Sequence, residues 1–150
     1  MILVEGFKDL NKLTININNN AIKSTKIIKN HYKINTKGVF TIKYKINTDN
    51  DFEMEKMFKN IKYLKTIEMN SDNNITLKSI NSAFNGCSNL ESFKMKGFNR
   101  SDISSFKKLF HKTNLSYIDL KENVFDAKNA EDMSFIFSGT KIKTLIFPIF

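Results

Sequence analysis

The side chains that most often carry chemistry in proteins are sparse in this sequence of 150 residues. Cys87 is the single cysteine, so an intrachain disulfide is impossible. The histidines His31 and His111 lie far apart, and no Cys, His or Asp spacing is typical of a metal site. Phosphate-loop, nucleophile-elbow and zinc-protease motifs are also missing. The sequence therefore predicts a protein that is not an enzyme and that binds no metal and no cofactor.

Cys87 and His111 each have a simple structural interpretation. A cysteine nucleophile needs a neighbouring base or cation that lowers its pKa, and the motif around Cys87 contains none. We therefore expect Cys87 to be a buried structural thiol. His111 falls at a loop position where the other copies of a repeat, described below, carry Asn, Lys or Ser, so we expect it to be solvated.

The charge of the chain offers a second kind of chemistry, the attraction of a polyanion. The net charge is +9, and residues 1–50 contain nine lysines and three acidic residues. These lysines either form a solvated face or bind an anionic partner such as nucleic acid, a glycan or an acidic protein surface. Arg100 is the one arginine, and no nucleic-acid motif is present, so nucleic acid is not the favoured partner. The candidate polyanion contacts are Lys23, Lys26, Lys29, Lys33, Lys43 and Lys45.

The elements that position these residues come from a repeat in the last hundred residues. Its four copies are anchored on Phe58, Phe84, Phe110 and Phe137, at periods of 26, 26 and 27 residues. A fixed period in the twenties is typical of a solenoid, in which each unit buries its apolar side chains against its neighbours. We therefore expect residues 51–150 to form a solenoid of four repeats with a Phe core.

Each repeat combines two apolar patterns. The first is an i, i+3, i+4 triplet such as Met54, Met57 and Phe58, which places three side chains on one face of a short helix. The second is an L-x-x-L-x-L string, as in residues 64–69, whose last part alternates as in a strand. The expected fold class is α/β, with a parallel sheet on one face of the solenoid and short helices on the other.

Residues 1–50 lack the full repeat and predict a β-rich N-terminal cap. Residues 13–17 and 40–46 alternate in polarity, which indicates two strands. A turn at 35–38 and a strand through about 27–34 would complete a hairpin. The spacing of Leu10, Leu13 and Ile15 also fits a degenerate first repeat. We expect the cap and the repeats to form one compact domain.

The second copy resembles a known repeat. Residues 84–90 read FNGCSNL and are followed by Phe93 and Met95, which is similar to the BspA-like leucine-rich repeat, of the type M-x-x-M-F-x-G-C-x-x-L-x-x-L-x-L. The resemblance covers about residues 54–147, although copies three and four lack the cysteine and one loop residue. It implies a leucine-rich-repeat solenoid without catalytic residues, used for surface binding and adhesion in bacteria, protists and some viruses.

This resemblance favours a non-enzymatic protein-binding or structural module, such as a surface or virion-associated subunit of a larger assembly. The alternative is the electrostatic binder of nucleic acid or another polyanion. The first residues, MILVEGFKDL, lack the features of a signal peptide, and no stretch approaches the ~18 apolar residues of a membrane span. We therefore expect a soluble protein, at a cell surface or in a virion if the resemblance holds.

The strand positions that face away from the core are the natural binding surface of a solenoid. In one ladder Glu68, Lys94 and Asp119 alternate in charge, and this ladder either holds the register, at about 0.2–1 kcal/mol per pair, or contacts a ligand. Tyr117 is the best single contact residue, because tyrosine is favoured at interface hot spots. The candidate partner-binding residues are Thr66, Glu68, Ser92, Lys94, Tyr117, Asp119, Thr144 and Ile146.

The C-terminal end of the sequence predicts an assembly contact. Around Pro148 the other five residues of 145–150 are apolar, whereas solenoids normally end in a repeat with a polar outer face. We expect another chain, a copy of the protein or a different one, to cover this end. The alternative is that the tail folds back over its own last repeat. The candidate assembly contacts are Leu145, Phe147, Ile149 and Phe150.

Overall fold

The structure is a computed structural model that describes residues 13–18, 20–22, 42–46, 51–99, 102–120 and 127–146. Within these ranges the chain forms strands and no helix. In chain order the strands are β1 (Leu13–Ile17), β2 (Asn20–Ile22), β3 (Ile42–Ile46), β4 (Phe52–Glu53), β5 (Thr66–Ser79), β6 (Ser92–Asn99), β7 (Tyr117–Asp119) and β8 (Thr144–Ile146).

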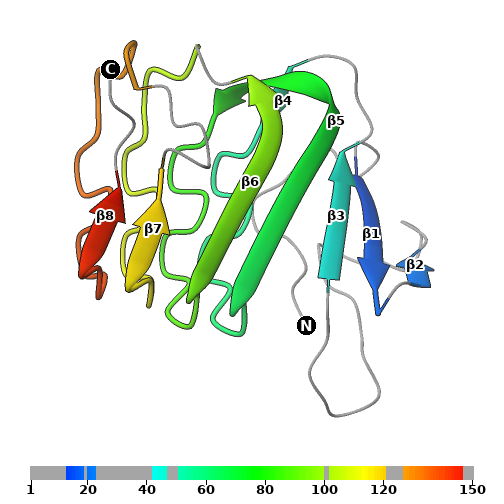
Figure 1. The fold of residues 1–150 in the computed structure, drawn as a ribbon, viewed down its shortest axis with the longest axis horizontal. Helices are drawn as coiled ribbons and strands as arrows, with labels where there is room; N and C mark the ends of the chain where they lie inside the picture. Colours follow the sequence, from blue (N-terminus) through cyan, green and yellow to red (C-terminus); the bar gives the residue numbers. More distant parts are fainter. Residues whose placement is uncertain are drawn as a thin grey trace.

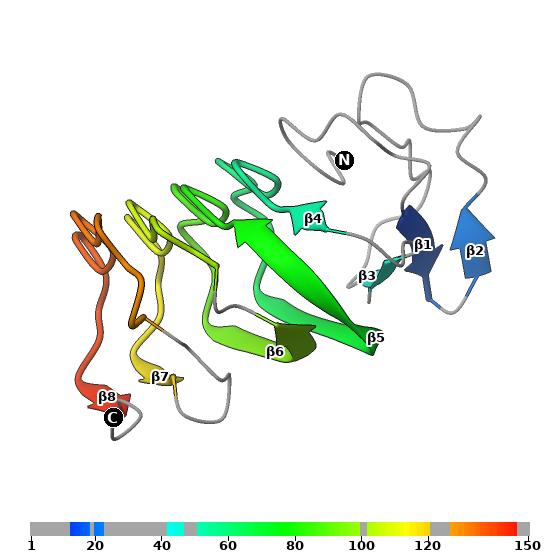
Figure 2. The ribbon, with the colours of Figure 1, turned by 90° about the horizontal axis from the view of Figure 1, so that it is seen from above.

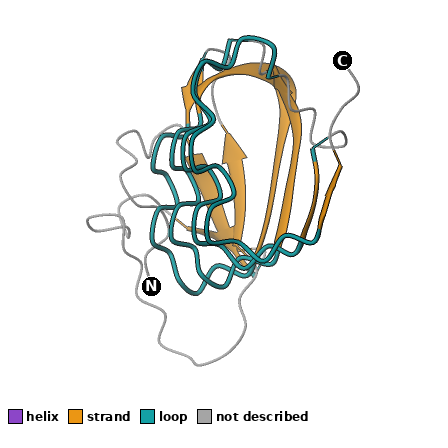
Figure 3. Cartoon of the chain, turned by 90° about the vertical axis from the view of Figure 1, so that its left-hand side faces the viewer, coloured by secondary structure: helices purple, strands orange, loops and turns teal. Residues whose placement is uncertain are grey.

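From residue 54 onward the chain winds into coils that lie side by side along the long axis of the molecule (Figure 1). We number them by repeat: the first coil is 54–79, the second 80–105, the third 106–132 and the fourth 133–146. Each begins with a turn segment and continues into one of the strands β5, β6, β7 and β8. Viewed along the stack, the strands lie on one side and the turn segments superpose on the other (Figure 3). The expected solenoid is therefore confirmed.

The parallel sheet is also confirmed. β5 pairs in register with β6, with Thr66 opposite Ser92, and β7 pairs with β8, with Ile118 opposite Leu145. β4 runs parallel to the far end of β5, because β5 is long enough to curl from one side of the coil to the other (Figure 2). The strands thus repeat once per coil, as the L-x-x-L-x-L strings predict.

The short helices are not confirmed, because their segments form chains of turns. In the first coil the Met57 N–H donates to the Met54 carbonyl at 3.0 Å, and the Lys59 N–H donates to the Lys56 carbonyl at 3.1 Å. Lys56 and Asn60 have φ angles of 56° and 62°, in the left-handed region that a right-handed helix cannot contain. Two left-handed residues, four positions apart, recur in every coil: Lys56 and Asn60, Ser82 and Gly86, Lys108 and Lys112, Phe135 and Gly139.

The backbone hydrogen bonds that a helix would keep within itself run between coils instead. The N–H groups of Lys56, Phe58 and Asn60 donate to carbonyl groups of the second coil at 2.8–3.0 Å. The same pattern joins the second coil to the third and the third to the fourth. The α/β class is not confirmed for the described residues, because an i, i+3, i+4 apolar triplet can face the core from consecutive turns as well as from a helix.

A ladder of phenylalanine rings fills the core, as predicted. Phe58 stacks on Phe84 at 5.3 Å between ring centroids, Phe84 on Phe110 at 5.8 Å, and Phe110 on Phe137 at 6.0 Å. Interplanar angles of 4–10° keep the rings nearly parallel. The first three are fully buried, and each such burial contributes about 1.5–3 kcal/mol.

The N-terminal strands extend the sheet and cover the first coil. β3 runs parallel to β5, and β1 pairs antiparallel with β2 and β3. The Tyr44 ring meets Phe58 edge to face at 5.1 Å, and burial raises the pKa of Tyr44 far above its usual range. The predicted N-terminal strands are confirmed at 13–17 and 42–46, whereas the turn at 35–38 and the strand at 27–34 lie outside the described residues.

Candidate functional site

The structure places the predicted contact residues of β7 and β8 on the outer face of the sheet. Tyr117 lies opposite Thr144 and Asp119 opposite Ile146, while Ile118 between them is buried. The Tyr117 side chain is 52% exposed and that of Ile146 is 37% exposed. Residues at such diagonal positions across a strand pair lie within reach of one aromatic side chain. An exposed aromatic and an exposed aliphatic residue therefore lie together at this end of the face.

The outer face of β5 and β6 is polar. Glu68 lies directly opposite Lys94, and Thr66 lies opposite Ser92. Glu68, Lys94 and Thr66 are exposed and Ser92 is half-buried. Although Glu68 and Lys94 face each other in register, no ion pair joins these two described residues. Their charges are therefore directed to solvent.

The predicted charge ladder is interrupted between β6 and β7. β6 pairs with β5 and β7 pairs with β8, in two separate sheets, so Lys94 has no registered partner in Asp119. The third copy is one residue shorter than the second between its Phe and its strand. The expectation of a continuous Glu68, Lys94 and Asp119 ladder was wrong, because β6 and β7 do not pair.

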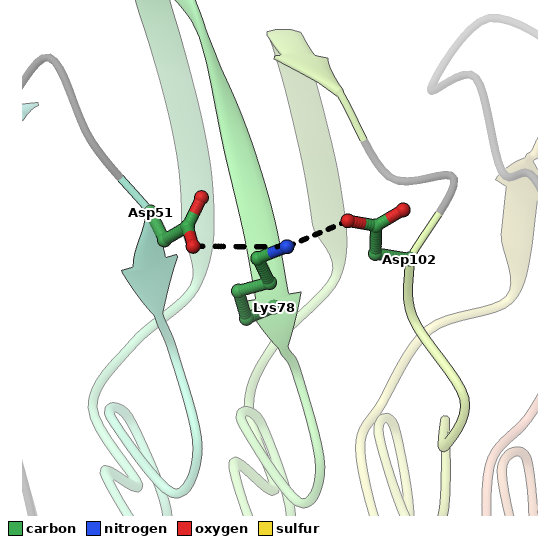
Figure 4. A network of polar contacts seen from close by, with 3 residues as sticks. All are labelled: Asp51, Lys78 and Asp102. Carbon is green, nitrogen blue, oxygen red and sulfur yellow. Dashed lines mark hydrogen bonds and ion pairs between the residues drawn. The ribbon is translucent and has the colours of Figure 1, made fainter.

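Ion pairs elsewhere connect neighbouring coils, and the sequence reasoning missed them. Lys78 at the end of β5 lies 2.6 Å from Asp102 and 3.6 Å from Asp51, which precedes β4 (Figure 4). Lys65 pairs with Glu91 of the next coil at 3.3 Å, whereas Lys107 pairs with Asp132 at the end of its own coil at 3.2 Å. The signal that predicts them is a pair of opposite charges separated by about one repeat. The pairs of Lys78 with Asp102 and of Lys65 with Glu91 are thus contacts between successive coils.

Cys87 is buried, as expected, and is held as a thiol. Its Sγ donates to the Phe58 carbonyl of the preceding coil at 2.9 Å, and burial raises its pKa to about 12. Thr113 and Thr140 occupy the same repeat position, but their hydroxyls donate to the Phe carbonyls of their own coils, those of Phe110 and Phe137. This position therefore carries a small hydrogen-bond donor in the second, third and fourth coils.

His111 is half-buried and not simply solvated. Its Nδ1 lies 3.0 Å from Asn85 Oδ1 of the preceding coil, and burial, followed by the charges of Lys112 and Lys108, lowers its pKa. Next to it Phe135 is 58% exposed with a φ of 58°, and the Lys108 ammonium lies 5.6 Å from its ring centroid. A phenylalanine in this conformation is strained. It stands where the other copies carry Lys or Ser, which is the sequence signal that could have found it.

The remaining candidates are only partly visible. Lys43 and Lys45 are exposed on β3, whereas Lys23, Lys26, Lys29 and Lys33 lie outside the described residues. Leu145 is half-buried, and Phe147, Ile149 and Phe150 lie outside the described residues. In the part of the chain that the structure describes, no group of three potential ligands could hold a metal ion. Over the same residues, no helix is long and apolar enough to cross a membrane.

Comparison with known proteins found no match: no family model fits the chain, and no curated protein or solved structure is significantly similar to it. The contact surfaces therefore have to be interpreted from their own geometry. Two of them combine exposed apolar side chains with polar surroundings, the sheet face of the third and fourth coils and the adjoining C-terminal end of the solenoid.

Proposed function

We propose that the protein is a non-enzymatic binding module whose third and fourth coils engage a partner protein through the outer face of β7 and β8. The observation that carries the proposal is the exposed Tyr117 beside the exposed Ile146, with Thr144 and Asp119 next to them. Interfaces concentrate their binding energy in a few aromatic anchors surrounded by a polar rim. This face has that composition.

The rigidity of the solenoid supports this function. Tyr117 and Ile146 stand on paired strands. Between them Ile118 belongs to the same core cluster as the Phe ladder and Leu145 packs against that cluster, which favours a face that is ordered before binding. A preordered surface loses little conformational entropy when a partner binds. The long-range hydrogen bonds between coils contribute to the same rigidity.

We further propose that the repeat is of the BspA-like leucine-rich type. The support is the motif FNGCSNL at 84–90, together with a solenoid that has a parallel sheet. In that family the implied role is surface binding or adhesion. By this relation the protein would act as a surface or virion-associated subunit of a larger assembly.

Affinity purification from the source organism tests the proposal. Native protein is compared with Tyr117→Ala and Lys94→Ala, and with Tyr63→Ala as the matched control, because Tyr63 is 45% exposed at the end of a turn segment and not on the strands. We expect the Tyr117 and Lys94 variants to lose a partner that the Tyr63 variant retains. Equal recovery of the partner by all four proteins would place the binding surface elsewhere.

The alternative, electrostatic binding of nucleic acid or another polyanion, has one favourable observation. Lys43 and Lys45 are both exposed on β3. In the solenoid, Lys65, Lys78 and Lys107 are paired with carboxylates. The alternative therefore rests on the N-terminal lysines, and its test is given in the Discussion.

A further inference from the structure

Alternate backbone N–H groups of the turn segments all donate in the same direction along the stack. In each of the first three coils, three alternate N–H groups donate to carbonyl groups of the next coil, as Ser82, Phe84 and Gly86 do to residues 107, 109 and 111. All nine bonds of this kind in the described residues measure 2.8–3.0 Å. The N–H groups therefore face the C-terminal end of the stack, and the carbonyl groups face the N-terminal end.

The fourth coil has the same donors, but the described residues supply them with no acceptor. By the repeat, its donors are the N–H groups of Phe135, Phe137 and Gly139, and none of them has an acceptor among the described residues. Phe135 and Gly139 are exposed, and Phe137 is half-buried. The turn side of the C-terminal end is therefore a row of N–H groups, two residues apart, without carbonyl groups between them.

Side-chain burial identifies the same end independently. The ring ladder stops at Phe137, which is half-buried, although the three earlier rings of the ladder are fully buried. Ile136 and Leu145 are also half-buried, whereas their counterparts in the preceding coils are buried. The end of the solenoid thus presents apolar contact area directly beside the row of donors.

Two arrangements of identical copies do not fit this end. In a two-fold dimer of C-terminal ends, the N–H row of one copy would face the N–H row of the other, with donors opposite donors. A head-to-tail stack would need the free N-terminal face of the first coil. That face is covered, because Phe58 is fully buried and the Tyr44 ring packs on it.

We infer that the C-terminal end of the solenoid is a docking site for an extended polypeptide segment of another protein. The segment supplies backbone carbonyls at every second residue to the N–H groups of Phe135, Phe137 and Gly139. It places an apolar or aromatic side chain against the Phe137 ring, in the same way that the Phe ring of each coil stacks on the Phe ring of the coil before it. Backbone pairing at an open edge is a common mode of peptide recognition. Because this edge carries N–H groups, it pairs with a segment that presents carbonyl groups.

Charge favours a segment with acidic flanks. Lys112 lies against Gly139, and Lys141 and Lys143 are exposed on the same coil. The carboxylate of Asp132, in contrast, is paired with Lys107. This surface is distinct from the outer face of β7 and β8, so the inference goes beyond the proposed function and does not depend on it.

Amide hydrogen exchange by NMR tests the inference. In the free protein, the amides of Phe135, Phe137 and Gly139 should exchange at least about tenfold faster than those of Phe84, Gly86 and Phe110. The probe is a synthetic peptide of residues 79–96 with Cys87→Ser, because this segment carries the carbonyl row and the ring that the first coil receives. Saturating peptide should protect the three amides of the fourth coil.

Matched controls separate docking from loss of folding. The peptide with Phe84→Ala should bind at least about tenfold more weakly, and this change leaves the protein itself unaltered. Tyr117→Ala protein should bind the peptide with the affinity of the native protein. A negative result in this peptide experiment is therefore distinct from a negative result in the test of the proposed function. Slow exchange of the three amides in the free protein would overturn the inference, as would a two-fold dimer in light scattering. Absence of protection at about 1 mM peptide would also overturn it.

Discussion

The Nζ atom of Lys78 lies 2.6 Å from the carboxylate of Asp102, a residue in the next coil. The hydrogen bond to Asp102 is the largest of the effects that raise the pKa of Lys78, ahead of the influence of Asp51 on its other side. One lysine thus connects three neighbouring rows of the solenoid. Because all three side chains are exposed, salt screens their attraction.

Lys78→Met should lower the melting temperature at low ionic strength, and the difference should shrink at about 1 M salt. A raised pKa stabilises the folded state below the ordinary lysine pKa of 10.5, and this stabilisation is lost as the pH rises through the folded value. Thermal melts at about pH 7 and about pH 11 should therefore differ less for the variant. Lys94→Met is the control, and an equal effect in both variants would contradict the assignment.

Asp132 should contribute to stability under acid. Hydrogen bonds from Ser134, followed by the interaction with Lys107, lower its pKa from 3.8 to about 2. This contribution to the free energy of unfolding is present above pH 3.8 and is lost as the pH falls from 3.8 to about 2. The melting temperature of Asp132→Asn should therefore depend less on pH than that of the native protein within this window. An unchanged pH dependence would show that Asp132 is not coupled to folding.

Phe84→Ala should cost about 3–5 kcal/mol of unfolding free energy, because it leaves a cavity in the middle of the ring ladder. Phe137→Ala should cost clearly less, since that ring is half-buried at the end. Urea denaturation of the two variants measures the difference. Equal losses would mean that the fourth coil is as well packed as the second.

Cys87 should be inert in the folded protein. With a pKa of about 12, its thiol should fail to react with a disulfide reagent at about pH 8, and it should react once the protein is unfolded. Cys87→Thr should stay within about 1 kcal/mol of the native protein, because a threonine at this repeat position in the next two coils donates to the Phe carbonyl of its own coil, which for residue 87 is the carbonyl of Phe84. Cys87→Val, which has no donor, should be the less stable variant. Rapid labelling of the folded protein would contradict this account.

Nucleic acid should bind weakly, if at all, at physiological salt. Titration with single- and double-stranded DNA and RNA at two salt concentrations measures this, because binding led by lysine falls steeply as salt rises. Lys43→Gln with Lys45→Gln should change nothing at the higher salt. Tight binding that these substitutions abolish would instead establish the polyanion alternative.

The repeat was the most informative part of the sequence, because regular contacts between neighbouring copies require apolar residues at a fixed period. The spacing of Phe58, Phe84 and Phe110 predicted the Phe core, and the alternating strings predicted the strands. Burial of Cys87 followed from its place within that period. These features depend on side-chain polarity alone.

The turn segments could not be predicted in the same way. Three apolar residues at i, i+3, i+4 suit a helix and a chain of turns equally, and the choice depends on left-handed positions such as Lys56 and Lys108. Lysine has no intrinsic preference for that conformation, so Gly86, Gly139 and Asn60 were the available signals. The ion pairs and the break between β6 and β7 also depend on the packing of separate coils, which the local pattern does not contain.

The one-way hydrogen bonding of the turn segments makes this side of the solenoid electrically polar. In an ordinary sheet the peptide dipoles alternate and nearly cancel, but here the nine N–H groups of the turn segments that donate to the next coil all point the same way along the stack axis. Their partial charges add as they do in an α-helix, with the positive pole at the fourth coil and the negative pole beneath the N-terminal strands. An anionic group therefore meets an attractive field at the C-terminal pole, and inserting further repeats would move the two poles apart without changing either surface.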